Sequence, residues 1–325
     1  VFGAFLNFAV QIPTLIGVGM HYRPIIDLNH PGVRKFFALL VPVFIGLSVT
    51  HLNTFVGTNL GSSLGEGIVT ALSNAQRLMM LPVGVFAISI AVASFPTMAA
   101  HVAQNNMEAY KEDLSLSFRT IVFINVPAAV GMAVLSVPIV RAMYMQGNFT
   151  LANMDVTADA LVFYCIGLLG YGAQHALNRG FYAIQDTKSP VAINVGVIIL
   201  NIALSIILSK VLGYRGLALA YSIAGLVSIA ALLWGLNRKV GRLGGKRMLV
   251  SCIKSLVSSS IMGIAVYFTA KGLENIWDMS LKTAQITEVC VAVAVGVAVY
   301  AVMAYVLKME EMHEALKIVR RKVGR

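Results

Sequence analysis

The sequence has few charged residues and few cysteines, and each shortage excludes a class of protein. Charged residues make up only 12% of the 325 residues, whereas a soluble domain carries about 25%. The cysteines Cys165, Cys252 and Cys290 show no CxxC spacing and stand alone in apolar surroundings, so neither a disulfide framework nor a thiolate metal site is indicated. We expect all three to be small core residues.

The sequence consists largely of long apolar runs with few charged residues, and these runs predict a membrane protein. Hydrophobic residues make up 58% of the chain, and the mean hydropathy is +0.80. A helix that crosses a bilayer needs about 20 apolar residues, whereas a membrane β-barrel shows alternating segments of about ten. The expected fold is therefore an all-α polytopic helical bundle. The predicted spans are 1–20, 34–60, 68–100, 117–145, 155–184, 189–211, 214–236, 248–271 and 284–307.

The first residues do not match a secretory signal. The sequence starts at Val1 within an apolar stretch, without an initiating Met, a basic region or a small-residue cleavage site. We interpret this stretch as a membrane span, and we expect the beginning of the protein to be missing.

The net charge of +11 is explained by topology, without nucleic acid as a partner. Seventeen of the 25 Lys and Arg residues fall on alternate connections or in the tail. By the positive-inside rule, these parts and the C-terminus face the cytoplasm, where anionic lipid attracts them. Residues 308–325 are expected to form a basic amphipathic helix on the inner leaflet. Residues 101–116 form either a weaker surface helix or a solvated, frayed one.

Arg77 is the leading functional candidate because a charged group inside a span costs at least about 2.5 kcal/mol. Ser73 and Arg77 are four residues apart, so they share one helix face. Residues 68–100 would form a helix longer than the membrane, so Arg77 could instead lie near the outer surface and snorkel to water.

Two further spans carry polar stripes. In the span 34–60, His51 shares a face with Thr54 and Thr58, and Asn53 lies on the adjoining face. Such a stripe either lines a water-filled cavity or forms hydrogen bonds between packed helices, and packing is the default. The span 189–211 has another stripe, with Asn194, Asn201 and Ser205. Prolines 42, 82, 96, 127 and 138 fall within spans, where each permits bending, and bent helices around polar faces favour a transporter.

A membrane enzyme acting on lipid-linked sugars is a rival interpretation, and a non-transporting scaffold is another. An enzyme would need a carboxylate or histidine cluster, but the acids are scattered and the histidines show no HxxxH spacing. Asp155 and Asp159 come closest to a pair. We expect them to lie at a helix N-terminus, where negative charge is favourable.

Several segments, in order, resemble the bacterial MurJ/MviN lipid II flippases of the polysaccharide-exporter superfamily. The resemblance covers most of the chain and is densest from 40 to 200. The matching segments are Gln11–Pro13, Gly46–His51, Asn74–Phe86, Phe95–Thr97, Met145–Thr150 and Gly180–Pro190.

The resemblance implies an architecture and an activity. Members have fourteen spans in two six-helix lobes with a terminal pair, so this chain would hold the last nine. Residues 1–20 would close the N-terminal lobe, 34–236 would form the C-terminal lobe, 248–307 would form the terminal pair with a groove for the lipid tail, and 308–325 the cytoplasmic tail. Members are not enzymes. They move lipid II from the cytoplasmic to the periplasmic leaflet of the bacterial inner membrane by alternating access, and an exporter of another lipid-linked oligosaccharide is the nearest alternative.

The resemblance also implies site residues. Arg77 matches the family's cavity arginine, which would bind the pyrophosphate. Ser73, His51 and Asn53 would line the same cavity. Family members often carry acids where this chain has Gln76 and Met80.

No cofactor is implied for the chain, although transport would be coupled to the membrane potential or to a monovalent cation. Some members have a cation-binding carboxylate near the position of Gly57. The resemblance therefore does not imply coupling to sodium here, and the expected partners are lipid II and membrane lipids.

Overall fold

The computed structural model describes residues 12, 13, 17, 51–145, 150–277 and 281–312. The chain divides into two compact units, Val1–Ser48 and Val49–Arg325, and every helix discussed below belongs to the second. Within the described residues, seven helices are long and apolar enough to cross a membrane. The predicted span 1–20 and most of the span 34–60 lie outside the described residues, as does most of the predicted tail helix.

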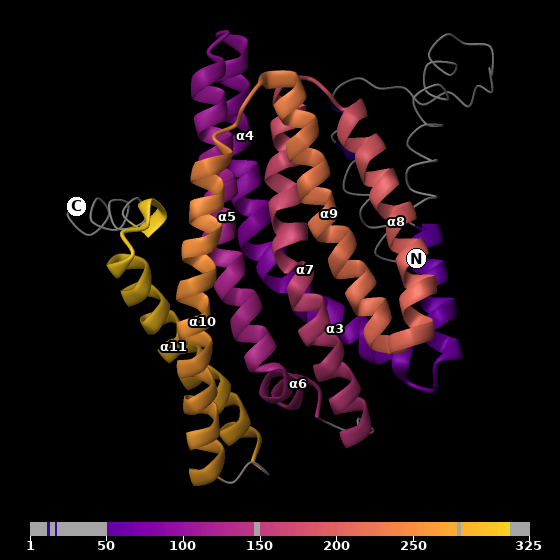
Figure 1. Ribbon diagram of the computed structural model, residues 1–325. Helices are drawn as coiled ribbons and strands as arrows, with labels where there is room; N and C mark the ends of the chain where they lie inside the picture. Colours follow the sequence, from indigo (N-terminus) through magenta and orange to yellow (C-terminus); the bar gives the residue numbers. More distant parts are fainter. Residues whose placement is uncertain (1–11, 14–16, 18–50, 146–149, 278–280, 313–325) are drawn as a thin grey trace. The chain divides into compact units, whose positions relative to one another are not determined.

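The described unit is helical throughout, and Figure 1 shows its helices running side by side. Residues 51–63 are helical, and the predicted spans between 68 and 307 are confirmed as helices. The elements are α3 (Ile68–Pro82), η1 (Val83–Ala87), α4 (Ile88–Ala103), α5 (Met107–Val134), α6 (Ser136–Tyr144), α7 (Leu151–Ala183), α8 (Lys188–Leu212), α9 (Tyr214–Val240), α10 (Gly245–Ile276) and α11 (Lys282–Val306).

Two of the expected boundaries are wrong. The single span 117–145 is interrupted at Leu135, which separates α5 from the short α6. Neither alternative for 101–116, a surface helix or a solvated, frayed one, is correct. Helix α4 ends at Ala103, and α5 begins at Met107, where Asn106 caps it by accepting a hydrogen bond from the Ala109 backbone N–H. Tyr110 and Leu114 are fully buried, and the Tyr110 hydroxyl donates to the Gly180 carbonyl at 2.9 Å. Residues 107–116 therefore belong to the membrane-length helix α5.

Pro82 changes the winding of the first long described helix. Proline has no N–H to donate and its ring collides with the preceding turn. In this chain the turn after Pro82 is the π-helix η1, after which α4 continues to Ala103. The insertion of such a turn shifts the faces that the two halves present to their neighbours, as expected for a proline within a span.

Helix α7 is the central element, because it packs against α3, α5 and α9. Small residues let α7 and α9 approach closely, as is usual between membrane helices. A Cβ atom added to Gly170 would lie 2.4 Å from the Gly225 carbonyl carbon, and one added to Gly167 would lie 2.5 Å from the Ser222 Cα. The Ser222 hydroxyl also donates to the Phe163 carbonyl at 2.6 Å.

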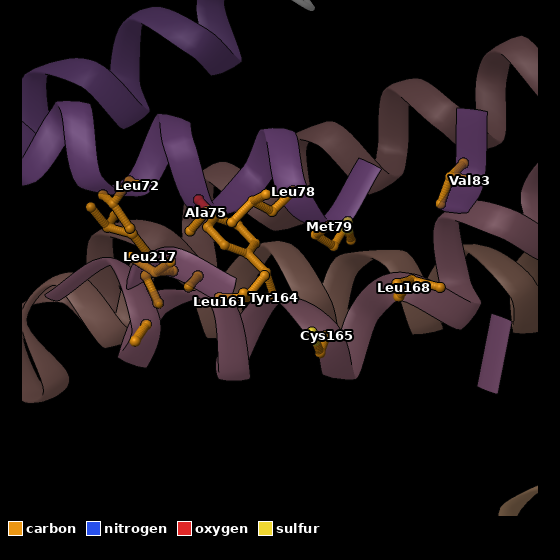
Figure 2. Packing of buried hydrophobic residues seen from close by; sticks show 14 of the residues in the cluster. Leu72, Ala75, Leu78, Met79, Val83, Leu161, Tyr164, Cys165, Leu168 and Leu217 are labelled. Carbon is orange, nitrogen blue, oxygen red and sulfur yellow. The ribbon is translucent and has the colours of Figure 1, made fainter. Parts of the chain in front are cut away.

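Apolar side chains fill the space between α3 and α7. Figure 2 shows Leu72, Ala75, Leu78 and Met79 of α3 facing this neighbouring helix. The α7 residues Leu161, Tyr164, Cys165 and Leu168 belong to the same cluster, and Leu217 of α9 joins them at one side. A second cluster, around Tyr110, Phe181 and Leu236, joins α4, α5, α7 and α9. The buried Cys165 agrees with the expected core role, whereas Cys290 is exposed and does not.

Charged clusters attach the antiparallel pair α10 and α11 to the other helices at both ends. The Arg141 guanidinium of α6 binds Glu274 of α10 at 3.0 Å and Glu288 of α11 at 2.8 Å. At the other end, Arg119 of α5 binds Glu310 and Glu311, which follow α11. The pair is thus fixed by ion pairs as well as by apolar contacts.

Two contacts link basic connections of the described unit to neighbouring connections, whereas Arg23, Arg34 and Lys35 of the predicted pattern lie outside the described residues. Lys239 at the end of α9 pairs with Asp186, which lies in the turn between α7 and α8. Desolvation opposes ionisation of Asp186, but hydrogen bonds from Lys239 and Ser189 outweigh it and lower the pKa of Asp186 to about 2. Lys254 donates to the Leu307 carbonyl, which places the start of α10 beside the end of α11.

Adding one methyl group at the α7–α9 contact tests its importance. We expect Gly170→Ala to lower the free energy of unfolding in detergent by about 2 to 3 kcal/mol, because the backbones must separate. Gly196→Ala in α8 is the matched control, since a Cβ atom there has nothing within 4 Å. It should leave stability unchanged or raise it by up to about 1 kcal/mol. Equal melting temperatures for the two variants would contradict a close contact.

Removal of the shared cation tests the Arg141 cluster. The Glu288 side chain is fully buried, so Arg141→Met should destabilise the protein by about 3 to 5 kcal/mol through an unpaired carboxylate. Adding Glu288→Gln to this variant should restore part of the loss. Lys271→Met removes a 58% exposed partner of Glu274 and should cost less than about 1 kcal/mol. Thermal unfolding with wild-type behaviour in Arg141→Met would show that the cluster does not hold the pair.

Candidate functional site

A polar pocket lies among residues 51–63, α3, α7, α8 and α9 and has a volume of about 150 Å³. The hydroxyl and amide groups that line it come from segments far apart in the sequence. The polar residues of the lining are Asn53, Thr54, Thr58, Ser73, Gln76, Tyr164, Asn201, Ser205 and Tyr221.

An amide pair holds one side of the pocket together. The Asn201 side-chain N–H donates to the Asn53 Oδ1 at 3.0 Å, and the Ser205 hydroxyl lies 3.4 Å from the Asn201 Oδ1. Asn201 and Ser205 are buried on α8. The polar stripes were interpreted either as the lining of a cavity or as hydrogen bonds between packed helices. Both interpretations apply to Asn53 and Asn201, because these amides join two helices and also line the polar pocket. Asn194 joins helices in the same way, since it accepts a hydrogen bond from Gln174 at 2.8 Å.

Two tyrosines, Tyr164 and Tyr221, also line the pocket, and the periodicity of polar residues in the sequence did not predict them. The rings of Tyr171 and Tyr221 stack with centroids 4.2 Å apart, and Tyr164 meets Tyr221 edge to face at 5.4 Å. The Tyr171 hydroxyl donates to the Tyr221 carbonyl at 3.3 Å. A tyrosine within an apolar span is itself a signal, because its hydroxyl needs a partner when buried.

The structure brings only two of the four predicted site residues together. Asn53 and Ser73 both line the polar pocket, whereas His51 and Arg77 are exposed and do not line it. Arg77 lies directly after Gln76, which lines the pocket. Arg77 is therefore next to the polar site in the sequence but does not line it in this conformation.

An apolar pocket is lined by residues of α3 that follow Arg77 in the sequence. It has a volume of about 550 Å³ and is lined by parts of α3, η1, α5, α6 and α11. Leu81 and Val85 line it, and both are more than half exposed. Arg77, Leu81 and Val85 follow one another at steps of four along the helix, although the π-turn shifts the last step. Helix α3 thus carries a polar face, then a cation, then an apolar face.

The oxygen atoms that line the polar pocket do not favour binding of a cation. Its described lining offers neutral amide and hydroxyl oxygens, with Gly57 where the resemblance places a carboxylate. No group of three or more His, Cys, Asp or Glu residues gathers within the described ranges. A cation here would have no negative charge to balance it.

The aspartate pair does not lie at a helix N-terminus, so that expectation is wrong. Helix α7 begins earlier, at Leu151, because Thr150 caps it by accepting from the Asn153 backbone N–H. Asp159 instead accepts hydrogen bonds from Arg215 and Tyr214 at the start of α9. Its role is to join α7 to α9.

Labelling of an engineered cysteine tests whether water fills the polar pocket. With the three native cysteines replaced by alanine, we expect Ser73→Cys to react at least about tenfold faster with a charged thiosulfonate than Val297→Cys. Val297 is 64% exposed on the apolar surface of α11. The reactive thiolate forms only where water reaches the sulfur. Similar rates at both positions would show that the pocket is closed to water.

Comparison with known proteins gives one consistent result. The sequence matches the family described as "Lipid II flippase MurJ" over residues 1–312. A lipid II flippase MurJ from Burkholderia cenocepacia is 31% identical over 242 residues, which cover 73% of this chain and 47% of that protein. A probable lipid II flippase MurJ from Vibrio cholerae is 31% identical over 235 residues, which cover 72% of this chain and 45% of that protein.

Solved structures agree with the sequence relatives. A lipid II flippase MurJ in an inward closed conformation matches with a TM-score of 0.75 and 27% identity, covering all of this chain and 61% of the other. An outward-facing multidrug resistance MATE transporter of the MOP superfamily matches at 16% identity with a TM-score of 0.52, covering 87% of this chain and 67% of the other, which shows a shared fold alone. The chain spans about half the length of the curated relatives it matches.

Proposed function

Because the chain belongs to the MurJ family of lipid II flippases, we propose that it takes part in moving lipid II from the cytoplasmic to the periplasmic leaflet of the bacterial inner membrane. It acts as a transporter rather than an enzyme, by alternating access between the two sides. Lipid II, the substrate, carries a disaccharide-peptide on a pyrophosphate and a polyprenyl tail.

The order of surfaces along α3 is the observation that carries the proposal. Such a lipid presents a polar head, then an anionic pyrophosphate, then an apolar tail. Along α3, Ser73 and Gln76 line a polar pocket, Arg77 supplies a cation, and Leu81 lines an apolar pocket. The three parts of the substrate and the three surfaces occur in the same order, so Arg77 binds the pyrophosphate by charge-assisted hydrogen bonds.

The terminal pair contributes to the apolar surface. Ile286, Val289 and Cys290 of α11 line the apolar pocket opposite α3. This agrees with a role of residues 248–307 in holding the lipid tail beside the lobe formed by residues 34–236. Burying each CH₂ group of a tail contributes about 0.8 kcal/mol relative to water, but much less relative to the bilayer, so the groove orients the tail more than it attracts it.

The polar pocket must enlarge for transport. Its volume of about 150 Å³ is below the roughly 300 to 1,000 Å³ of ligand pockets. The head group of lipid II therefore enters only when the helices around Asn53 and Asn201 separate. That separation breaks a hydrogen bond of about 0.6 kcal/mol, which is small enough for a reversible conformational change.

Orientation and energy coupling complete the proposal. The end of the bundle that carries the connections near Lys111, Lys239 and Lys246 faces the cytoplasm, and so does the C-terminus, according to the positive-inside rule. The membrane potential drives the cycle in preference to a cation, because the described lining of the polar pocket offers no carboxylate. His51 enters the cavity in another conformation.

Replacement of the cavity cation tests the proposed function. In the gene that encodes this chain, Arg77→Ala should abolish growth of a strain depleted of its own lipid II flippase, because the pyrophosphate loses its counter-charge. Lys210→Ala removes an exposed cation at the end of α8 and should support normal growth. Normal growth of Arg77→Ala, with the protein present at the wild-type level, would exclude this role.

A further inference from the structure

A basic pocket lies where α5, the start of α10 and the residues after α11 meet. Its volume is about 190 Å³. Its charged lining consists of Arg119, Lys246, Arg247, Lys254, Glu310 and Glu311. Four positive charges therefore face two negative ones, and the pocket has a net charge of about +2 at neutral pH.

Arg119 already engages both carboxylates. Its Nη1 lies 2.5 Å from the Glu310 Oε2 and 3.3 Å from the Glu311 Oε1, and Glu311 also accepts from the Ser251 hydroxyl at 3.0 Å. The hydrogen bond from Arg119 lowers the pKa of Glu310 below its usual value. Both carboxylates are thus paired with Arg119, and the excess positive charge of the pocket comes from Lys246, Arg247 and Lys254.

Donors in the pocket remain without acceptors. Arg119 is only 7% exposed, and its Nε has no hydrogen-bond partner among the described residues. A buried N–H without a partner costs about 1 to 3 kcal/mol, so an acceptor at this place is favourable. Lys246 and Arg247 are exposed, and neither takes part in a salt bridge within the described ranges. The pocket therefore offers N–H donors and positive charge to an anion.

The pocket lies at the end of an apolar strip on α10. Lys254 donates to the Leu307 and Lys308 carbonyls where α11 ends, so the pocket is at the level where helices leave the membrane. Starting beside it, Val250, Val257 and Ile264 are exposed at steps of seven, which places them on one face of α10. A basic site therefore continues directly into a surface suited to acyl chains.

We propose that this pocket binds the phosphate diester of an anionic glycerophospholipid, whose acyl chains lie along Val250, Val257 and Ile264. The phosphate accepts hydrogen bonds from Lys246 and Arg247, and the Arg119 guanidinium, which also lines the pocket, adds positive charge. Basic pockets between membrane helices bind anionic headgroups through this combination of charge and apolar contact. The bound lipid joins α5 to the α10–α11 pair, and it is a lipid of the bilayer, distinct from the transported substrate.

A lipid-binding measurement on the whole gene product tests the proposal. Purified protein in a neutral detergent is titrated with phosphatidylglycerol that carries a fluorescent acyl chain. The double substitution Lys246→Gln and Arg247→Gln should weaken binding at least about tenfold, because each basic residue at the site contributes to attraction of the headgroup. Arg119 is left unchanged, since its replacement would leave Glu310 and Glu311 unpaired.

The control removes the same charge from the neighbouring surface. Arg238→Gln with Arg242→Gln alters two exposed residues that do not line the pocket, and it should bind phosphatidylglycerol as the wild-type protein does. Arg77→Ala should also bind normally, which separates this test from the test of transport.

Three results would overturn the proposal. The first is equal weakening by the two double substitutions, which would indicate diffuse attraction. The second is equal affinity for phosphatidylcholine, which would exclude recognition of net charge. The third is displacement of the lipid by inorganic phosphate but not by chloride of the same ionic strength, which would indicate a soluble anion as the ligand.

Discussion

The close contact between α7 and α9 is the constraint on which the rest of the described structure depends. In a membrane the hydrophobic effect does not drive helices together, so packing of small residues and hydrogen bonds must do so. Gly167 and Gly170 meet Ser222 and Gly225 at backbone distance. This contact stacks Tyr221 of α9 on Tyr171 of α7, and Tyr221 lines the polar pocket together with Tyr164.

Ion pairs place the terminal helices against this central core. Arg141 and Arg119 act at opposite ends of the α10–α11 pair, and each binds two carboxylates. Burying such charges is costly, so their contribution is to position more than to net stability. With α11 held in this way, Val289 and Cys290 lie opposite α3 and complete the apolar pocket.

Composition and hydropathy were sufficient to predict the helical membrane fold and the spans from 68 onward, because the length of a span is set by the bilayer. The break at Leu135 and the start of α5 at Met107 could not be predicted so easily, since a cap and a change of packing decide them. The periodicity of polar residues found Asn53, Ser73 and Asn201, but not the tyrosines. Tyr164 and Tyr221 join the site only because glycines on other turns let their helices meet, which is a property of three-dimensional packing.

Transport of lipid II itself is the most direct test of the account, in which a polar pocket, Arg77 and an apolar pocket follow one another along α3. The whole gene product would be reconstituted in vesicles that contain lipid II, and the head group reaching the opposite leaflet would be measured with an added enzyme that modifies it. We expect transfer well above that of empty vesicles, and loss of this transfer when Arg77 is replaced by alanine. Transfer equal to that of empty vesicles, from folded protein, would contradict it.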